Sequence, residues 1–129
     1  MERMGPGQRI VVTYERGDAA ATLLEFLRET FGLEVLRLAP DEHDRAMAYM
    51  QSLPFFIARA LVSIDILDLP NTDELSIPSF RKLAEIASIE EHHTHEMFET
   101  SQRSNPYAQD ARREFLKALA QLQDELEPD

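Results

Sequence analysis

The densest group of residues that could do chemistry lies between positions 90 and 96, in the sequence EEHHTHE. It contains histidines and glutamates, which are common metal ligands; they are Glu90, Glu91, His92, His93, His95 and Glu96. Glu90 and His93 have the Glu-x-x-His spacing of di-iron helical bundles, which also need a second Glu-x-x-His and two further glutamates. The chain contains no second Glu-x-x-His, and side chains one helical turn apart also pair on ordinary surfaces. We therefore predict a solvated or interface cluster with no bound metal, and a helical metalloprotein as the alternative.

Composition and charge exclude several functional classes. The 129 residues include no cysteine, which excludes a disulfide framework, a thiolate metal site and a cysteine nucleophile. The net charge of −11 argues against nucleic-acid binding, because the protein repels phosphate. Lysine occurs only at positions 82 and 117, which fits either a halophilic source or a GC-rich genome.

The sequence also lacks signals for a membrane location. The apolar run at 53–69 contains Arg59, Asp65 and Asp68, and is too short and too charged for a membrane span. Residues 1–8 have no apolar signal-peptide core. We expect a cytoplasmic protein that does not bind membranes.

The first forty residues predict one βαβ unit. Residues 9–13 (RIVVT) form an apolar, β-branched run typical of a buried parallel strand, and residues 34–38 (EVLRL) form a second. Between them, residues 19–31 have helical apolar spacing, with Asp18 as the expected N-cap and Gly32 as the expected C′ residue. Because two strands make an unstable sheet, we expect this unit to be the end of a larger sheet or an edge that pairs with another copy.

From residue 41 the pattern is helical, and a central helix at 41–69 organises it. Its apolar positions step by three or four residues, and from Leu53 onward the opposite side is apolar too. Such a helix must be covered on several sides, so we predict that it is shared between subunits of a homodimer. Shorter helices are expected around Phe80–Ala87, from a capping box at 88–91 to Arg103, and from Asn105-Pro106 to Leu126.

Three motifs in this order resemble prephenate dehydrogenases, the oxidoreductases of tyrosine biosynthesis. They are EHDRAMAYMQSLPFF from Glu42, SIPSFR from Ser76 and QRSNPYA from Gln102. The resemblance implies a helical dimerisation and substrate domain at 41–129, preceded at 1–40 by the last βαβ of a nucleotide-binding domain. The fold class we predict is α+β, mainly α, with about four helices after the βαβ unit.

The resemblance also implies a cofactor that this chain is not expected to bind. Members bind NAD or NADP on a Rossmann domain that carries G-x-G-x-x-G and the catalytic histidine. That motif is absent, because the four glycines are Gly5, Gly7, Gly17 and Gly32. We therefore expect NAD or NADP to belong to another domain or to a separate nucleotide-binding chain.

Individual site residues follow from the same resemblance. It implies that Arg81 binds a carboxylate of prephenate, arogenate or tyrosine, as a guanidinium can through two parallel hydrogen bonds; the alternative is an ion pair with Glu85. It places His43 and Asp44 at the domain junction. Many members have a histidine where this chain has Phe55, so no catalytic residue is assigned. A regulatory or scaffold dimer that has lost ligand binding remains a second hypothesis.

Overall fold

The computed structural model describes residues 6–127 and confirms the predicted α+β, mainly helical fold. The chain forms two compact units, the first ending at His43 and the second beginning at Asp44. The predicted domain border at residue 40 lies three residues before this division. Each unit is described by itself.

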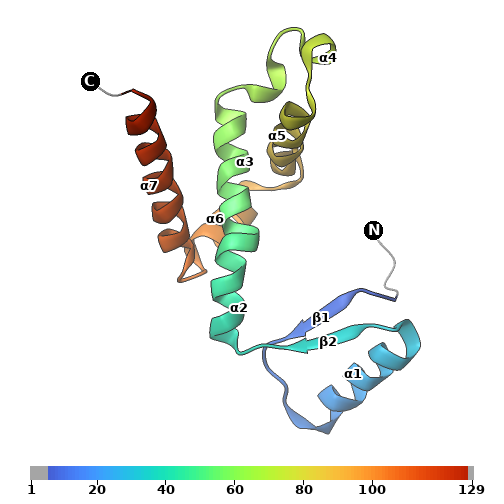
Figure 1. The fold of residues 1–129 in the computed structure, drawn as a ribbon. Coiled ribbons are helices and arrows are strands. Elements are labelled where there is room, and N and C mark those ends of the chain that lie inside the picture. The colour runs from blue at the N-terminus through green and yellow to red at the C-terminus, as the bar shows by residue number, and fades with distance from the viewer. Residues whose placement is uncertain (1–5, 128–129) are drawn as a thin grey trace. The chain divides into compact units, whose positions relative to one another are not determined.

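The first unit is the expected βαβ unit. Strand β1 (Arg9–Val12) pairs in parallel with β2 (Glu34–Arg37), with Arg9 opposite Glu34, and α1 (Gly17–Phe31) connects them (Figure 1). The Arg9 Nε donates to the Glu34 carboxylate at 2.8 Å across the strand pair. That this unit extends a larger sheet or pairs with a copy stays a prediction.

The two predicted ends of α1 have different outcomes. Gly32 ends the helix with a left-handed φ of 66°, and its N–H donates to the Arg28 carbonyl, as expected for a C′ glycine. The prediction of Asp18 as N-cap is wrong, because the helix begins one residue earlier, at Gly17, and no side chain caps it. Asp18 therefore lies inside the first turn, where a carboxylate suits the helix dipole.

The central helix is shorter than predicted. Helix α2 (Pro40–Met47), a π-helical turn η1 (Ala48–Ser52) and α3 (Leu53–Ser63) follow one another, and the helical run ends six residues before Leu69. Asp65 adopts a left-handed φ of 55°, and its N–H bonds to the Val62 carbonyl three residues back. A 3₁₀ turn, η2 (Ile66–Asp68), follows, so Asp65 and not Pro70 ends the helix.

Pro54 explains why the run contains a π-helical turn. Proline has no N–H, and its ring clashes with the carbonyl four residues earlier in a regular α-helix. Directly before it, the Leu53 N–H bonds to the Ala48 carbonyl, five residues back. The wider turn lets the proline follow without a break in the helix, and such turns are frequent at functional sites.

The remaining helices are α4 (Thr72–Leu75), α5 (Pro78–Ser88), a 3₁₀ turn η3 (Ile89–His92), α6 (His95–Arg103) and α7 (Ala108–Leu126). The predicted capping box at Ser88 is wrong, because the Ser88 hydroxyl donates back to the Glu85 carbonyl. Thr94 caps α6 instead, accepting from the Met97 N–H at 3.1 Å. Helix α7 ends at Leu126 as predicted but begins at Ala108, after a turn at Asn105–Tyr107.

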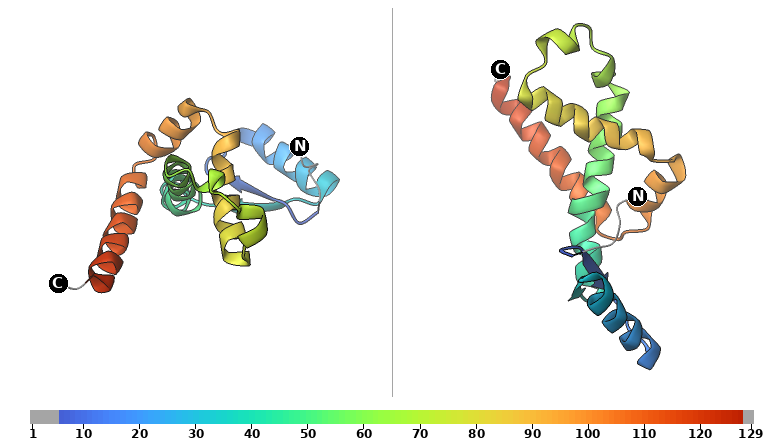
Figure 2. Two further views of the ribbon diagram at one scale, coloured as in Figure 1. Left: turned by 90° about the horizontal axis from the view of Figure 1, so that it is seen from above. Right: turned by 90° about the vertical axis from the view of Figure 1, so that its right-hand side faces the viewer.

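Within the second unit, α3 is the centre of the packing. It contacts α5, α6 and α7, and α5 and α7 lie on different sides of it (Figures 1 and 2). Among the described residues of this unit, every fully buried apolar side chain is an alanine; these are Ala48, Ala58, Ala87, Ala108 and Ala111. The helices thus approach closely through small residues, and the large apolar side chains remain partly exposed. In the part of the chain described, no helix is long and apolar enough to cross a membrane.

Candidate functional site

Arg81 lies on the wall of an open pocket in the helical unit. Helix α5 begins at Pro78, whose fixed φ suits the first helical position, and the Arg81 N–H donates to the Ile77 carbonyl at 3.1 Å. The pocket has a volume of about 770 Å³ and lies between α5 and the segment that contains η2 and α4. We call it the Arg81 pocket. Its lining combines apolar, hydroxyl and charged side chains, which are Leu67, Phe80 and Ala84, then Thr72, Ser76 and Ser88, then Asp73, Arg81 and Glu85.

The charged side chains of the Arg81 pocket do not neutralise one another. Arg81, Asp73 and Glu85 are all exposed. Among residues 6–127, no ion pair within 4 Å involves any of the three, so the alternative Arg81–Glu85 pair is not formed. The guanidinium therefore keeps its donors available for a ligand oxygen.

Arg59, on α3, has the opposite environment. Its Nε donates to Glu90 Oε1 at 2.6 Å, and its Nη1 lies 3.2 Å from His95 Nδ1. The guanidinium also lies over the Phe98 ring, 3.8 Å from the centroid, which adds a cation–π contact. The side chains of Arg59 and Glu90 are only 32% and 16% exposed. This group, the Arg59 cluster, joins α3 to η3 and α6.

The histidine-rich segment is used for packing, because Glu90 and His95 both lie at Arg59 while His93 has other partners. Glu90 pairs with Arg59, whereas His93 Nδ1 lies 2.7 Å from the Ile89 carbonyl and its ring lies 4.0 Å from the Phe55 ring, centroid to centroid. Because residues 89–92 form a 3₁₀ turn and His93 is extended, the Glu-x-x-His spacing does not place both side chains on one α-helical face. Within residues 6–127, no group of three or more His, Asp or Glu side chains is placed to hold a metal ion.

The Phe55–His93 contact borders a second, smaller hollow of about 340 Å³. Gln51 of η1 and Phe55 of α3 line it, together with Met97 and Thr100 of α6. His93 donates through Nδ1, because a carbonyl oxygen can only accept, so its Nε2 is the unprotonated nitrogen when the ring is neutral. The Phe55 ring on α3 thus packs against the imidazole of His93, which follows η3.

A buried polar group supports the π-helical turn. The Ser52 hydroxyl donates to the Ser101 carbonyl at 2.8 Å, and Gln102 Nε2 donates to the Ser52 carbonyl at 2.6 Å. Arg112 Nη1 in turn donates to Gln102 Oε1 at 2.9 Å. Ser52 is 1% exposed and Gln102 is 7% exposed, so these bonds satisfy groups that water cannot reach. Gln102, the first residue of the QRSNPYA motif, therefore connects η1 with α6 and α7.

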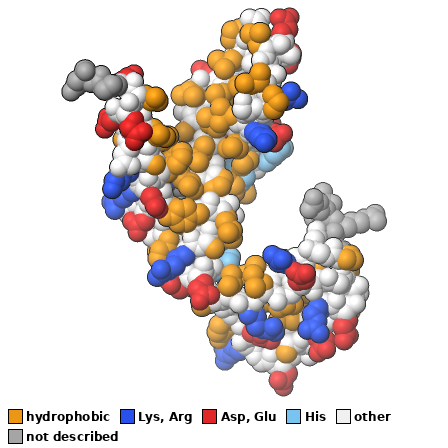
Figure 3. Space-filling view, viewed as in Figure 1, with side chains coloured by type: hydrophobic (Ala, Val, Ile, Leu, Met, Phe, Trp, Pro, Cys, Tyr) orange, Lys and Arg blue, Asp and Glu red, His pale blue; other side chains and the backbone are white. Residues whose placement is uncertain are grey.

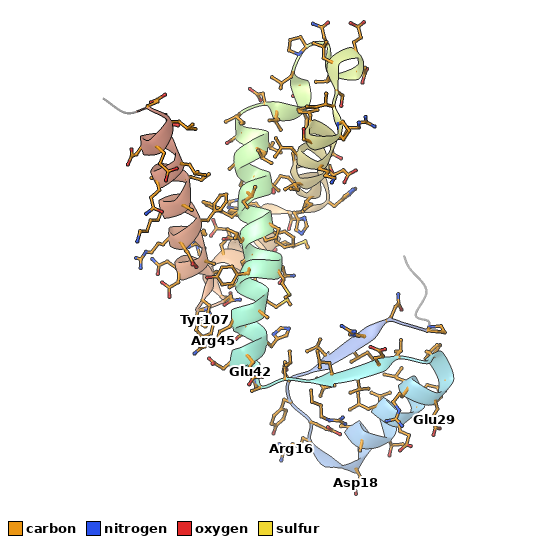
Figure 4. The ribbon with its side chains drawn as sticks, viewed as in Figure 1. Arg16, Asp18, Glu29, Glu42, Arg45 and Tyr107 are labelled. Atoms are coloured by element: carbon orange, nitrogen blue, oxygen red, sulfur yellow. The ribbon has the colours of Figure 1, made fainter. Side chains whose placement is uncertain are left out.

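The residues of the QRSNPYA motif attach the last turn to α2. Asn105 Nδ2 donates to the Asp44 carbonyl at 2.8 Å, and Asn105 Oδ1 accepts from the Tyr107 N–H at 2.9 Å. Arg45 lies over the Tyr107 ring, 4.8 Å from its centroid, and Figure 4 shows the two side chains together. His43 and Asp44, predicted at the domain junction, are the residues between which the two compact units divide. Whether they function as a junction stays a prediction.

Tyr49 makes a more exposed contact on the same helical run. Its hydroxyl donates to the Glu114 carboxylate of α7. This hydrogen bond, together with partial burial and the negative charges of Glu114 and Asp110, raises the pKa of Tyr49.

Sequence reasoning missed two of these groups. Arg59 was noted only as a charge that interrupts an apolar run, and Arg112 was not considered. Their partners lie 31 and 10 residues away in the sequence. A single arginine on an otherwise apolar helix is a usable signal, because a partly buried guanidinium requires a carboxylate or a ring as its partner.

Residues 39–129 match the family model described as prephenate dehydrogenase, dimerization domain. No curated protein matches the chain.

Proposed function

Because the chain belongs to the prephenate dehydrogenase dimerization-domain family, we propose that its helical unit forms a homodimer and binds the carboxylate of prephenate, arogenate or tyrosine in the Arg81 pocket. The observation that carries the dimer is that no large apolar side chain of this unit is fully buried among the described residues. A second copy would supply the missing cover.

The uncovered surface is concentrated on α7 and on the face of α3 beside it. Every residue of α7 from Leu116 to Leu126 is exposed, and Leu119 and Leu122 expose 46% and 54% of their area. Both views of Figure 2 show α7 diverging from α3 toward its C-terminal end, and Figure 3 shows hydrophobic side chains gathered over α3 and along α7. Burying a leucine fully contributes about 1.5–3 kcal/mol, so a few such residues per copy support a stable dimer.

Apolar side chains near the C-terminal end of the predicted central helix are also exposed. Ile64 is 64% exposed and Leu69 is 46% exposed. The predicted dimer contact through residues 41–69 therefore has exposed apolar side chains available. Helix α7 is a second candidate element of the interface, which the sequence did not predict.

The dimer is tested by the molar mass in solution. Light scattering at micromolar concentration should give about twice the 14.8 kDa of the chain. A variant with Leu119→Glu and Leu122→Glu should give the monomer mass, because the two glutamates would bring charge into the interface. The control, Lys117→Gln with Gln121→Glu, makes the same change in net charge on the opposite face of α7 and should remain dimeric. A monomeric native protein would contradict the proposal.

The ligand site is supported by the availability of Arg81. It is the one positively charged side chain that lines the pocket within the described chain, and it has no ion-pair partner there. Calorimetric titration with prephenate and with tyrosine should show saturable binding that Arg81→Ala weakens at least tenfold and that Lys82→Ala, on the neighbouring residue, leaves unchanged. Absence of binding to the native protein would favour the non-catalytic scaffold dimer.

The helical unit is not proposed to bind the cofactor. Since the sequence contains no G-x-G-x-x-G, we propose that NAD or NADP binds outside residues 44–129, on a nucleotide-binding domain or a second chain. The helical unit then contributes the dimer contact and the substrate carboxylate site, and the chemistry of hydride transfer occurs where that cofactor is held.

A further inference from the structure

The Arg81 pocket contains more negative than positive charge. Arg81 contributes one positive charge, whereas Asp73 and Glu85 contribute two negative charges, and the whole protein carries a net charge of −11. A ligand that is only anionic meets one attractive group and two repulsive ones, and misplaced like charges reduce affinity strongly. A ligand that carries both charges can pair with all of them.

The placement of Arg81 and Glu85 suits such a ligand. They lie four residues apart on α5, so their Cβ atoms are about 5–6 Å apart on one face of the helix. In an α-amino acid, the carboxylate and the ammonium group are attached to the same carbon. The carboxylate can therefore bind Arg81 while the ammonium group reaches Glu85, with Asp73 of α4 as a second acceptor.

The rest of the pocket fits a ring with polar substituents. Phe80 and Leu67 offer apolar contact surface, and Thr72, Ser76 and Ser88 offer hydroxyl groups. The volume of about 770 Å³ exceeds what a single amino acid with a six-membered ring requires, so size does not exclude the ligand.

We propose that the Arg81 pocket selects α-amino acids with a six-membered ring side chain over the corresponding α-keto acids. Arg81 binds the carboxylate, and Glu85 and Asp73 bind the ammonium group. This inference rests on the proposed ligand site at Arg81. It identifies the ligand class as that of arogenate and tyrosine, and not that of prephenate, whose two carboxylates lack an accompanying ammonium group.

The test compares L-tyrosine with 4-hydroxyphenylpyruvate, which differ in the amino or keto group. In calorimetric titrations of the full chain, tyrosine should bind at least tenfold more tightly. Asp73→Asn combined with Glu85→Gln should remove this preference. The control, Glu74→Gln with Glu91→Gln, removes the same charge outside the pocket and should preserve it. Circular dichroism of each variant verifies that the helices are intact.

The possible failures separate the two proposals. Equal or tighter binding of the keto acid to the native protein, with affinity still lost in Arg81→Ala, would overturn the amino-acid preference and leave the ligand site standing. A preference for tyrosine that survives the Asp73–Glu85 double variant would overturn the assigned role of these carboxylates. Failure of both compounds to bind would overturn the ligand site and, with it, the selectivity.

Discussion

Two arginines of the same helical unit have opposite environments. Arg59 has its guanidinium hydrogen-bonded to Glu90, next to His95 and over Phe98, and is about one-third exposed. Arg81 is exposed at the wall of a pocket, and no ion pair to it is found in residues 6–127. The fold gives the first arginine an anion, an imidazole and an aromatic ring as partners, and it leaves the second available for a ligand.

This difference predicts different roles for the two arginines. A guanidinium removed from water requires partners, and removing either partner leaves an uncompensated charge. A guanidinium that stays in water needs no protein partner, and it contributes little to the free energy of unfolding. Arg59 should therefore matter for folding, and Arg81 for binding.

Arg59→Ala is expected to have the largest effect on stability. It leaves the Glu90 carboxylate, 16% exposed, without its cationic partner and removes the contact with Phe98. We expect the free energy of unfolding to fall by about 2 kcal/mol, measured by urea denaturation. Arg103→Ala breaks the Arg103–Glu99 pair, in which the arginine is 79% exposed, and should cost less than about 0.5 kcal/mol. Equal losses of unfolding free energy in Arg59→Ala and Arg103→Ala would contradict the claim that the partly buried arginine matters more for folding than an exposed one.

Gln102→Ala tests an uncharged side chain that, like Arg59, has its hydrogen-bond partners within the fold. The variant loses the hydrogen bonds to the Ser52 carbonyl and to Arg112, and it leaves a buried carbonyl without that donor. We expect a loss of about 1 kcal/mol in the same urea experiment. Gln121→Ala, at an exposed position of α7, is the control and should be neutral. A neutral Gln102→Ala would mean that water replaces these bonds.

Arg81→Ala should leave folding almost unchanged. Because Arg81 is exposed and unpaired within the described residues, its removal should alter the free energy of unfolding by less than about 0.5 kcal/mol in the absence of ligand. A loss as large as that of Arg59→Ala would show that Arg81 has a structural partner, and the comparison of the two arginines would fail.

Tyr49→Phe should have the smallest effect on stability. The contact that it removes can be detected in the titration of the Tyr49 phenol. The hydrogen bond to Glu114 raises the pKa of Tyr49, so this contact stabilises the fold fully below the ordinary tyrosine pKa of about 10 and is lost as the pH rises through the higher folded value. Subtracting the ultraviolet titration of Tyr49→Phe from that of the native protein isolates this group. A midpoint at or below pH 10 would contradict the contact.

The fold was predictable where the signal was local. The βαβ unit followed from two β-branched runs around a helical segment that ends at Gly32, and the C-terminal end of α7 followed from its leucine spacing. The end of the central helix was not predictable in this way, because an apolar pattern continues past Ser63 while Asp65 turns the backbone left-handed. Apolar periodicity reports which side chains need burial, and it does not report where the backbone stops being helical.

The site was predictable only in part, for a different reason. Arg81 was named through the resemblance of SIPSFR to a known family, but Asp73 lines the same pocket from a different helix, α4, and nothing in the local sequence pattern indicates this. The Arg59 cluster joins residues 31 and 36 positions apart, so its formation depends on how η3 and α6 pack against α3. The Glu-x-x-His spacing was not sufficient to predict a metal site for the same reason, since a 3₁₀ turn replaces the α-helix that the spacing assumes.

Thermal unfolding with and without L-tyrosine tests the central claim most directly, in the native protein, Arg59→Ala and Arg81→Ala. A ligand that binds only the folded state raises the midpoint temperature. We predict that tyrosine raises the midpoint of the native protein and also that of Arg59→Ala, from a lower starting value, and that it leaves Arg81→Ala unchanged. An equal rise in Arg81→Ala and the native protein would contradict the assignment of Arg81 as the ligand-binding arginine.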